Sequence, residues 1–173
     1  MVHRKSMNEI VELASFTLSS IAHRADKHFS GLGIIVYSGE SFGYSYYTSL
    51  RPGVPFQRGL HLGNDACIEM LLKTSNIQNT LHDGFVLFNS EGKLTHVAQY
   101  LFWKPVKWIV PSDRYGTRYM SALYGSFHRS VVIAAIVTHD RRCFIFRRGK
   151  TLEIDVNAAI KTGGAAYDFS SFE

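Results

Sequence analysis

Two short segments hold residues whose types and order suit a phosphate-bearing ligand. Residues 81–85 are Leu-His-Asp-Gly-Phe, and residues 115–119 are Tyr-Gly-Thr-Arg-Tyr. In the first segment Asp83 places a carboxylate beside a glycine, whose backbone a ligand can approach closely. In the second, Thr117 and Arg118 add a hydroxyl and a guanidinium to the backbone N–H groups of a predicted helix start. Each segment also has an ordinary interpretation, the first as a turn and the second as helix capping.

The composition is that of a chain that can bury a core and that favours anionic partners. The 173 residues are 46% hydrophobic and 19% charged, which fits one folded domain and excludes a disordered chain. The formal net charge is +5, and such a balance favours a nucleotide or a nucleic acid as partner. We expect the nucleotide rather than a nucleic acid.

Hydropathy and cysteine content predict the cellular location of the protein. The longest apolar run, residues 131–137, suits a buried strand and is too short to cross a bilayer, so we expect no membrane partner. Glu9 and Glu12 interrupt the N-terminal region, which therefore does not resemble a signal peptide. Cys67 and Cys143 form neither a CxxC pair nor a zinc pattern, so we expect two buried thiols and a cytoplasmic location.

The elements that must position these residues alternate between helix and strand. A capping box at residues 6–9 predicts a helix, and further helices begin near residues 64–65 and 115–117. Predicted strands lie at residues 33–37, 42–50, 85–88, 94–103, 131–137, 143–146 and 151–156. This order indicates an α/β or α+β sheet covered by helices. We expect an N-terminal helix (1–30), a nucleotide-binding domain (31–156) and a loose tail (157–173).

The two segments, in this order, resemble the motifs of the diadenylate cyclase family, whose domain joins two ATP molecules into cyclic di-AMP. The family has a Leu-His-Asp-Gly-Ala motif, then Gly-Thr-Arg-His-Arg-Ala-Ala, then an apolar strand ending in Val-Ser-Glu-Glu. This chain has Leu-His-Asp-Gly at 81–84, Gly-Thr-Arg at 116–118 and Thr-His-Asp at 138–140. The resemblance covers residues 31–156 and implies an α/β fold with a central mixed β-sheet covered by helices, as in diadenylate cyclases.

The resemblance also implies roles for individual residues. Asp83 would help activate a ribose 3′-hydroxyl for attack on the α-phosphate of a second nucleotide, and Gly84 would let the base or sugar approach the backbone. Thr117 and Arg118 would hold phosphates. Two copies would meet face to face, each bringing one nucleotide, so a homo-oligomer is expected. The predicted nucleotide-binding residues are Asp83, Gly84, Phe85, Gly116, Thr117, Arg118, Tyr119 and Thr138.

This chain departs from the family at positions that serve metal and phosphate. The family's alanine after Asp-Gly is Phe85 here, and its Arg-His-Arg is Arg118-Tyr119-Met120. In the family that histidine helps hold a divalent metal and the second arginine contacts phosphate. Losing both removes two electrostatic contributions to phosphoryl transfer. His139 and Asp140, where the family has two glutamates, are candidate ligands for Mn²⁺ or Mg²⁺ with ATP; their alternative is a solvated turn.

Two functions follow, and they belong to different classes. The changes at Tyr119 and Met120 favour a sensor-type domain that binds a purine nucleotide or a cyclic dinucleotide without efficient turnover. The alternative is an active, divergent diadenylate cyclase that makes cyclic di-AMP from two ATP with a divalent metal, and retention of Asp83 favours it. A structural or nucleic-acid role, in which the positive charge does the binding, is a third hypothesis.

Overall fold

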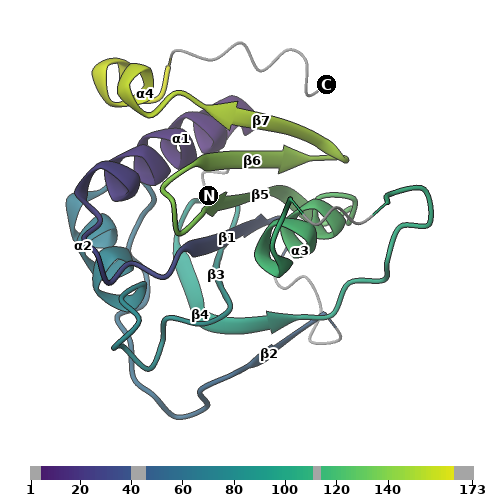
Figure 1. The fold of residues 1–173 in the computed structure, drawn as a ribbon, viewed down its shortest axis with the longest axis horizontal. Helices are drawn as coiled ribbons and strands as arrows, with labels where there is room; N and C mark the ends of the chain where they lie inside the picture. Colours follow the sequence, from purple (N-terminus) through teal and green to yellow (C-terminus); the bar gives the residue numbers. More distant parts are fainter. Residues whose placement is uncertain (1–4, 40–45, 111–113, 166–173) are drawn as a thin grey trace.

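The fold is built on one mixed β-sheet. Figure 1 shows it in a view down the shortest axis of the molecule. The computed structural model describes residues 5–39, 46–110 and 114–165. The sheet has seven strands in the order β2-β4-β3-β1-β5-β6-β7, in which β1 and β3 pair parallel and all other neighbours pair antiparallel. The strands are β1 (Leu32–Tyr37), β2 (Tyr47–Ser49), β3 (Phe85–Phe88), β4 (Leu94–Leu101), β5 (Val131–Val137), β6 (Cys143–Arg147) and β7 (Lys150–Ile154).

Helices cover both faces of this sheet. α1 (Met7–Arg24), α2 (Asp65–Thr74) and α4 (Val156–Thr162) lie on one face, and α3 (Thr117–Gly125) lies on the other (Figure 1). Successive side chains of a strand point to opposite faces, so β1 serves both cores. Ile34 and Val36 pack toward α1 and α2, whereas Ile35 and Tyr37 pack toward α3. The expected α/β architecture, a central mixed sheet covered by helices, is confirmed.

The N-terminal helix begins where its capping box predicts. Ser6 Oγ accepts from the Glu9 backbone N–H at 3.2 Å, and the Glu9 carboxylate accepts from the Ser6 N–H at 2.7 Å. These two bonds satisfy N–H groups that a helix start leaves unpaired. Its apolar stripe, including Ile10, Leu18 and Ile21, is fully buried against the sheet. In the described part of the chain, no helix is long and apolar enough to span a membrane.

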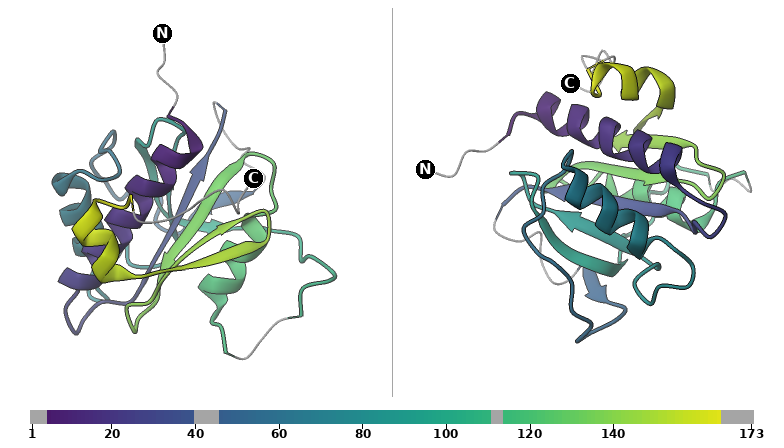
Figure 2. Two further views of the ribbon diagram at one scale, coloured as in Figure 1. Left: turned by 90° about the horizontal axis from the view of Figure 1, so that it is seen from above. Right: turned by 90° about the vertical axis from the view of Figure 1, so that its left-hand side faces the viewer.

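The C-terminal region differs from the expected loose tail. Residues 156–162 form α4, which Asp155 caps by accepting from the backbone N–H groups of Asn157 and Ala158 at 3.0 and 3.1 Å. The helix lies alongside α1 (Figure 2), and a Cβ at Gly164 would come within 2.1 Å of the Glu12 carbonyl oxygen. The prediction of a loose tail is therefore wrong for residues 157–162, because α1 supplies a packing partner that their short sequence does not reveal. Residues 166–173 lie outside the described part.

The other elements follow their predictions closely, with one exception. The hairpin of β3 and β4, the pair of β5 and β6, and the edge strand β7 are confirmed. The strand predicted over residues 42–50 is shorter, because β2 spans only Tyr47–Ser49, and residues 42–45 lie outside the described part. Cys67 and Cys143 are buried free thiols, as expected, and burial raises the pKa of each to about 12.

Candidate functional site

One cavity of about 690 Å³ brings the two motif segments together. Its walls come from the start of β3, the end of β4, the first turns of α3, the end of β5, and the loops before β1 and after β2. The lining includes every predicted nucleotide-binding residue and His139. Asp140 is not part of it. Segments that are distant in sequence meet here because β3 and β5 flank the central strand β1.

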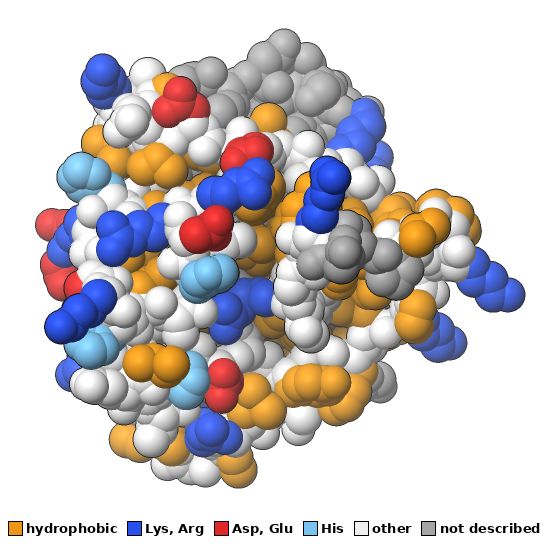
Figure 3. All heavy atoms as spheres, in the orientation of Figure 1, with side chains coloured by type: hydrophobic (Ala, Val, Ile, Leu, Met, Phe, Trp, Pro, Cys, Tyr) orange, Lys and Arg blue, Asp and Glu red, His pale blue; other side chains and the backbone are white. Residues whose placement is uncertain are grey.

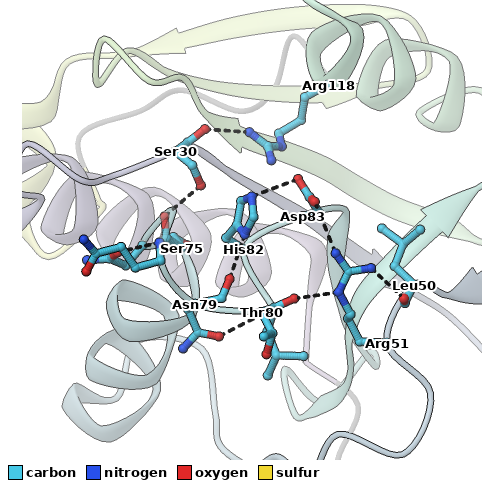
Figure 4. Close-up of polar contacts among 12 residues, drawn as sticks. Ser30, Leu50, Arg51, Ser75, Asn79, Thr80, His82, Asp83 and Arg118 are labelled. Carbon is cyan, nitrogen blue, oxygen red and sulfur yellow. Dashed lines mark hydrogen bonds and ion pairs between the residues drawn. The ribbon is translucent and has the colours of Figure 1, made fainter.

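The Asp83 carboxylate faces the cavity between two basic side chains (Figure 4). Its Oδ1 lies 3.3 Å from His82 Nε2, its Oδ2 lies 3.8 Å from Arg51 Nη2, and the side chain is 51% exposed. His82 Nδ1 lies 2.7 Å from the Asn79 carbonyl oxygen, which can only accept, so Nδ1 carries a proton. Each oxygen of the carboxylate thus has a basic side chain as its neighbour.

Arg51 is a site residue that the sequence prediction missed. Its Nε donates to the Thr80 carbonyl at 3.1 Å and its Nη1 donates to the Leu50 carbonyl at 2.9 Å. These two bonds hold the guanidinium at the cavity wall next to Asp83 (Figure 4). The sequence shows only an arginine at the start of a Pro/Gly loop, and a loop arginine is ordinary. The one signal that could have pointed to Arg51 is its place in a loop, because binding residues are often found on loops that a rigid scaffold holds.

Arg118 lies on the opposite side of Asp83 and is held by the loop before β1. Its Nη1 donates to the Ser30 carbonyl at 3.1 Å (Figure 4). Gly31 has φ +97°, and a Cβ there would come within 2.5 Å of the same Nη1, so the guanidinium lies directly on glycine backbone. Burial lowers the pKa of Arg118, and the field of Asp83 counteracts that effect. An arginine remains charged under these influences.

The start of α3 presents polar groups to the cavity. The helix begins at Thr117 after the N-cap residue Gly116, which makes no side-chain capping bond. Both residues are exposed and line the cavity. A Cβ at Gly116 would meet no atom within 4 Å, so sterics do not demand glycine there. The unpaired N–H groups of a helix start favour an anion at this place.

Gly84 and Phe85 have structural roles that the motif does not reveal. Gly84 has φ +81°, and a Cβ would come within 2.6 Å of the Gln99 carbonyl oxygen, so its missing side chain makes room for β4. Phe85 is 5% exposed, and its ring covers Gly33, where a Cβ would come within 2.6 Å of it. Phe85 therefore belongs to the core under α3 as well as to the cavity wall.

Tyr119 is held by aromatic packing. Its ring stacks on Tyr115 with centroids 3.9 Å apart and meets Phe144 and Phe146 edge-on at 5.3 and 4.7 Å. The residue is 8% exposed, and burial raises the pKa of its phenol. Its neighbour Met120 also lines the cavity. Neither side chain supplies a cation.

The turn after β5 carries the two proposed metal ligands. Thr138 Oγ1 accepts from the Arg142 backbone N–H at 2.9 Å and closes the turn, in which His139 and Asp140 are exposed. A hydrogen bond from the Thr138 side chain is the main cause that lowers the pKa of Asp140. Among the described residues no three His, Cys, Asp or Glu side chains are grouped as a metal site. Among the described residues that line the cavity, Asp83 is the one carboxylate, and this set does not fit a metal held by protein side chains.

Comparison with known proteins identifies the fold. No protein-family model matches the chain, and no curated protein matches its sequence. A crystal structure of a hypothetical membrane spanning protein from Bacillus cereus is similar, with a TM-score of 0.60 and 20% identity over 80% of this chain and 60% of that chain. DacA from Staphylococcus aureus, solved as a double cysteine mutant, has a TM-score of 0.58 and 18% identity over 89% of this chain and 92% of that chain.

Identities of this size establish fold rather than activity. The DacA structure is a diadenylate cyclase domain, and nearly all of it is matched. The expectation drawn from the motifs at residues 81–84 and 116–118 agrees with this match. The chain therefore has an α/β fold similar to that of a diadenylate cyclase domain.

Proposed function

We propose that this chain is a sensor-type nucleotide-binding domain whose cavity takes a purine nucleotide or a cyclic dinucleotide. The observation that carries the proposal is the convergence of both motif segments, with Asp83, Thr117 and Arg118, on one cavity. Its volume of about 690 Å³ lies within the range of roughly 300–1,000 Å³ that is usual for small-molecule sites. The similarity of the fold to a diadenylate cyclase domain supports the same ligand class.

The lining has the two kinds of side chain that a nucleotide needs. Arg51 and Arg118 offer guanidinium groups, which suit phosphate oxygens. Tyr100, Trp103 and Tyr124 offer aromatic surface, which suits a purine base. Positive charge beside aromatic surface favours a nucleotide over a simple phosphate.

The choice between sensor and enzyme depends on charge at the reacting centre. Tyr119 is packed among aromatic rings and Met120 is a thioether, so neither can balance the negative charge that develops in phosphoryl transfer. This supports binding without efficient turnover. One observation favours the alternative, an active divergent diadenylate cyclase: the Asp83 carboxylate is half exposed in the cavity, where it could accept a proton from a ribose hydroxyl.

Self-association is part of the proposal, as is a cytoplasmic location. Apolar side chains gather over the end of β4 and the segment after it (Figure 3), where Tyr100, Phe102, Trp108 and Val110 are 49–84% exposed. Tyr100 also lines the cavity. Exposed apolar surface of this kind commonly serves association, and here it would bring a second copy close to the cavity.

Isothermal titration calorimetry with ATP, GTP and cyclic di-AMP tests the proposal. We expect micromolar binding of at least one of them, equivalent to about 8 kcal/mol. Arg118→Ala should weaken that binding by about 2 kcal/mol, because a charge-assisted contact is lost. Arg58→Ala, an exposed arginine outside the cavity lining, is the matched control and should bind normally.

Two results would speak against the sensor function. Saturable binding of none of the three ligands would remove the nucleotide site altogether. Robust cyclic di-AMP formation from ATP with Mn²⁺ or Mg²⁺, seen by chromatography of the products, would establish the cyclase alternative instead.

A further inference from the structure

Arg51 has a geometry suited to a ligand oxygen. Two of its three nitrogens are committed to backbone carbonyls, Nε to Thr80 and Nη1 to Leu50. The third nitrogen, Nη2, points toward Asp83 at 3.8 Å, which is longer than a hydrogen bond. Nη2 carries two N–H donors. The guanidinium is therefore held in place by the protein while its outer edge faces the cavity beside the motif carboxylate.

The charges around the cavity disfavour a divalent cation at Asp83. Oδ1 faces His82 at 3.3 Å and Oδ2 faces Arg51 at 3.8 Å, so both oxygens already have basic neighbours. A Mg²⁺ ion binds carboxylate oxygen at about 2.1 Å, which would place it within a few ångströms of the fixed Arg51 guanidinium. Like charges at that separation repel, and water around the half-exposed side chains of Arg51 and Asp83 screens part of this repulsion. Within residues 5–39, 46–110 and 114–165, the lining supplies no second carboxylate to offset this repulsion.

The same charges suit phosphate directly. Arg51 and Arg118 lie on opposite sides of Asp83, each fixed by backbone carbonyls: Thr80 and Leu50 for the first, Ser30 for the second (Figure 4). Two guanidinium groups against one carboxylate leave net positive charge on the part of the lining that the structure describes. A phosphate group between them would receive charge-assisted hydrogen bonds without a metal bridge.

We propose that this site binds its nucleotide without a divalent metal, and that Arg51, together with Arg118, supplies the positive charge that a metal would otherwise bring. The inference rests on the proposed nucleotide-binding function and specifies how phosphate is held. Arg51 is then a ligand-binding residue outside both motif segments.

Calorimetry with ATP and with cyclic di-AMP, each in EDTA and in Mg²⁺, tests the inference. We expect affinities in the two conditions that agree within about twofold, a difference of roughly 0.4 kcal/mol. Binding that requires Mg²⁺ would overturn the metal-free site and leave the nucleotide-binding function standing. Lack of binding in both conditions would overturn the function and this inference with it.

Variants of Arg51 link the result to this side chain. Arg51→Gln should weaken binding in EDTA by about tenfold, and Mg²⁺ should restore part of the loss because Asp83 is then free of its cationic neighbour. Arg51→Lys keeps the charge but not the two-pronged geometry, so it should bind better than Arg51→Gln in EDTA. Arg58→Gln, in the same loop but outside the cavity, should behave like the unmodified protein.

The effect of Mg²⁺ on the affinity of Arg51→Gln distinguishes a phosphate-binding role of Arg51 from a role in holding the loop. Arg51 also ties down two backbone carbonyls, so Arg51→Gln could weaken binding by disturbing residues 80–83. A disturbed loop would weaken binding equally in EDTA and in Mg²⁺, and that outcome would overturn the inference. Wild-type affinity of Arg51→Gln in EDTA would overturn it as well.

Discussion

Replacing Gly31 by alanine should weaken nucleotide binding through Arg118, although Gly31 is not part of the cavity lining. Gly31 has φ +97°, a conformation that residues with a Cβ rarely adopt. The added Cβ would lie 2.5 Å from Arg118 Nη1 and 3.1 Å from the Val137 carbonyl oxygen. The carbonyl belongs to the central sheet and cannot retreat, whereas the guanidinium is the end of a flexible side chain. Arg118 must therefore move.

The size of the effect follows from two contributions. A left-handed backbone conformation at a residue with a Cβ costs about 1–2 kcal/mol. Displacing Arg118 breaks its bond to the Ser30 carbonyl, and hydrogen bonds that involve a charged group contribute roughly 1.5–3 kcal/mol. We expect the free energy of unfolding to fall by several kcal/mol. In a chain of this size, each kcal/mol lost lowers Tm by about 2–4 °C. ATP affinity should fall about tenfold, since a phosphate-binding cation leaves its position.

Gly59→Ala is the matched control for backbone strain. Gly59 has φ +75°, and a Cβ there would meet no atom within 4 Å. The two variants share the backbone cost, and Gly31→Ala adds the contacts of its new Cβ with Arg118 and with the Val137 carbonyl oxygen. Thermal unfolding of both variants measures these added contacts together, and ATP calorimetry reports the displacement of Arg118. If Gly31→Ala matches Gly59→Ala in Tm and in ATP affinity, the packing of Arg118 on residue 31 does not position it.

Further outcomes are expected at Phe85, at Tyr119 with Met120, and at the two cysteines. Phe85→Ala should lower stability by about 3–5 kcal/mol, because its ring fills the core over Gly33; unchanged Tm with altered nucleotide preference would show that the ring fills ligand space instead. The unmodified protein should make little or no cyclic di-AMP, and Tyr119→His with Met120→Arg should raise any residual formation with Mn²⁺, at a cost in Tm from lost aromatic packing; unchanged turnover would locate the deficit elsewhere. Cys67 and Cys143 should resist a thiol reagent at pH 8 until the protein unfolds, since burial raises the pKa of each from 9.0 to about 12. Because the pKa of each thiol is higher in the folded state, the buried neutral thiols contribute stability that is fully present below pH 9.0. This contribution to the free energy of unfolding is lost as pH rises toward 12, and unfolding measurements between those values would reveal the loss.

Local features of the structure were predictable because their determinants are neighbours in sequence. The capping box at Ser6 and Glu9, the β3–β4 hairpin and the β5–β6 pair each depend on residues a few positions apart. The segments at 81–85 and 115–119 were recognisable for the same reason. Local backbone geometry, such as the positive φ of Gly84 before β3, sets the directions of the side chains in these segments. The α/β class followed from the order of these local elements.

Tertiary structure alone decided how the site is completed. Arg51 meets Asp83 because β2 and β3 both neighbour β4, and Arg118 rests on Gly31 because α3 packs on the paired strands β1 and β5. Helix α4 forms against α1, more than a hundred residues away in the chain. None of these contacts leaves a pattern in a short window of sequence. Long-range strand pairing determines these contacts, since the strand order and register of one sheet covered on both faces decide which loops meet at its edge.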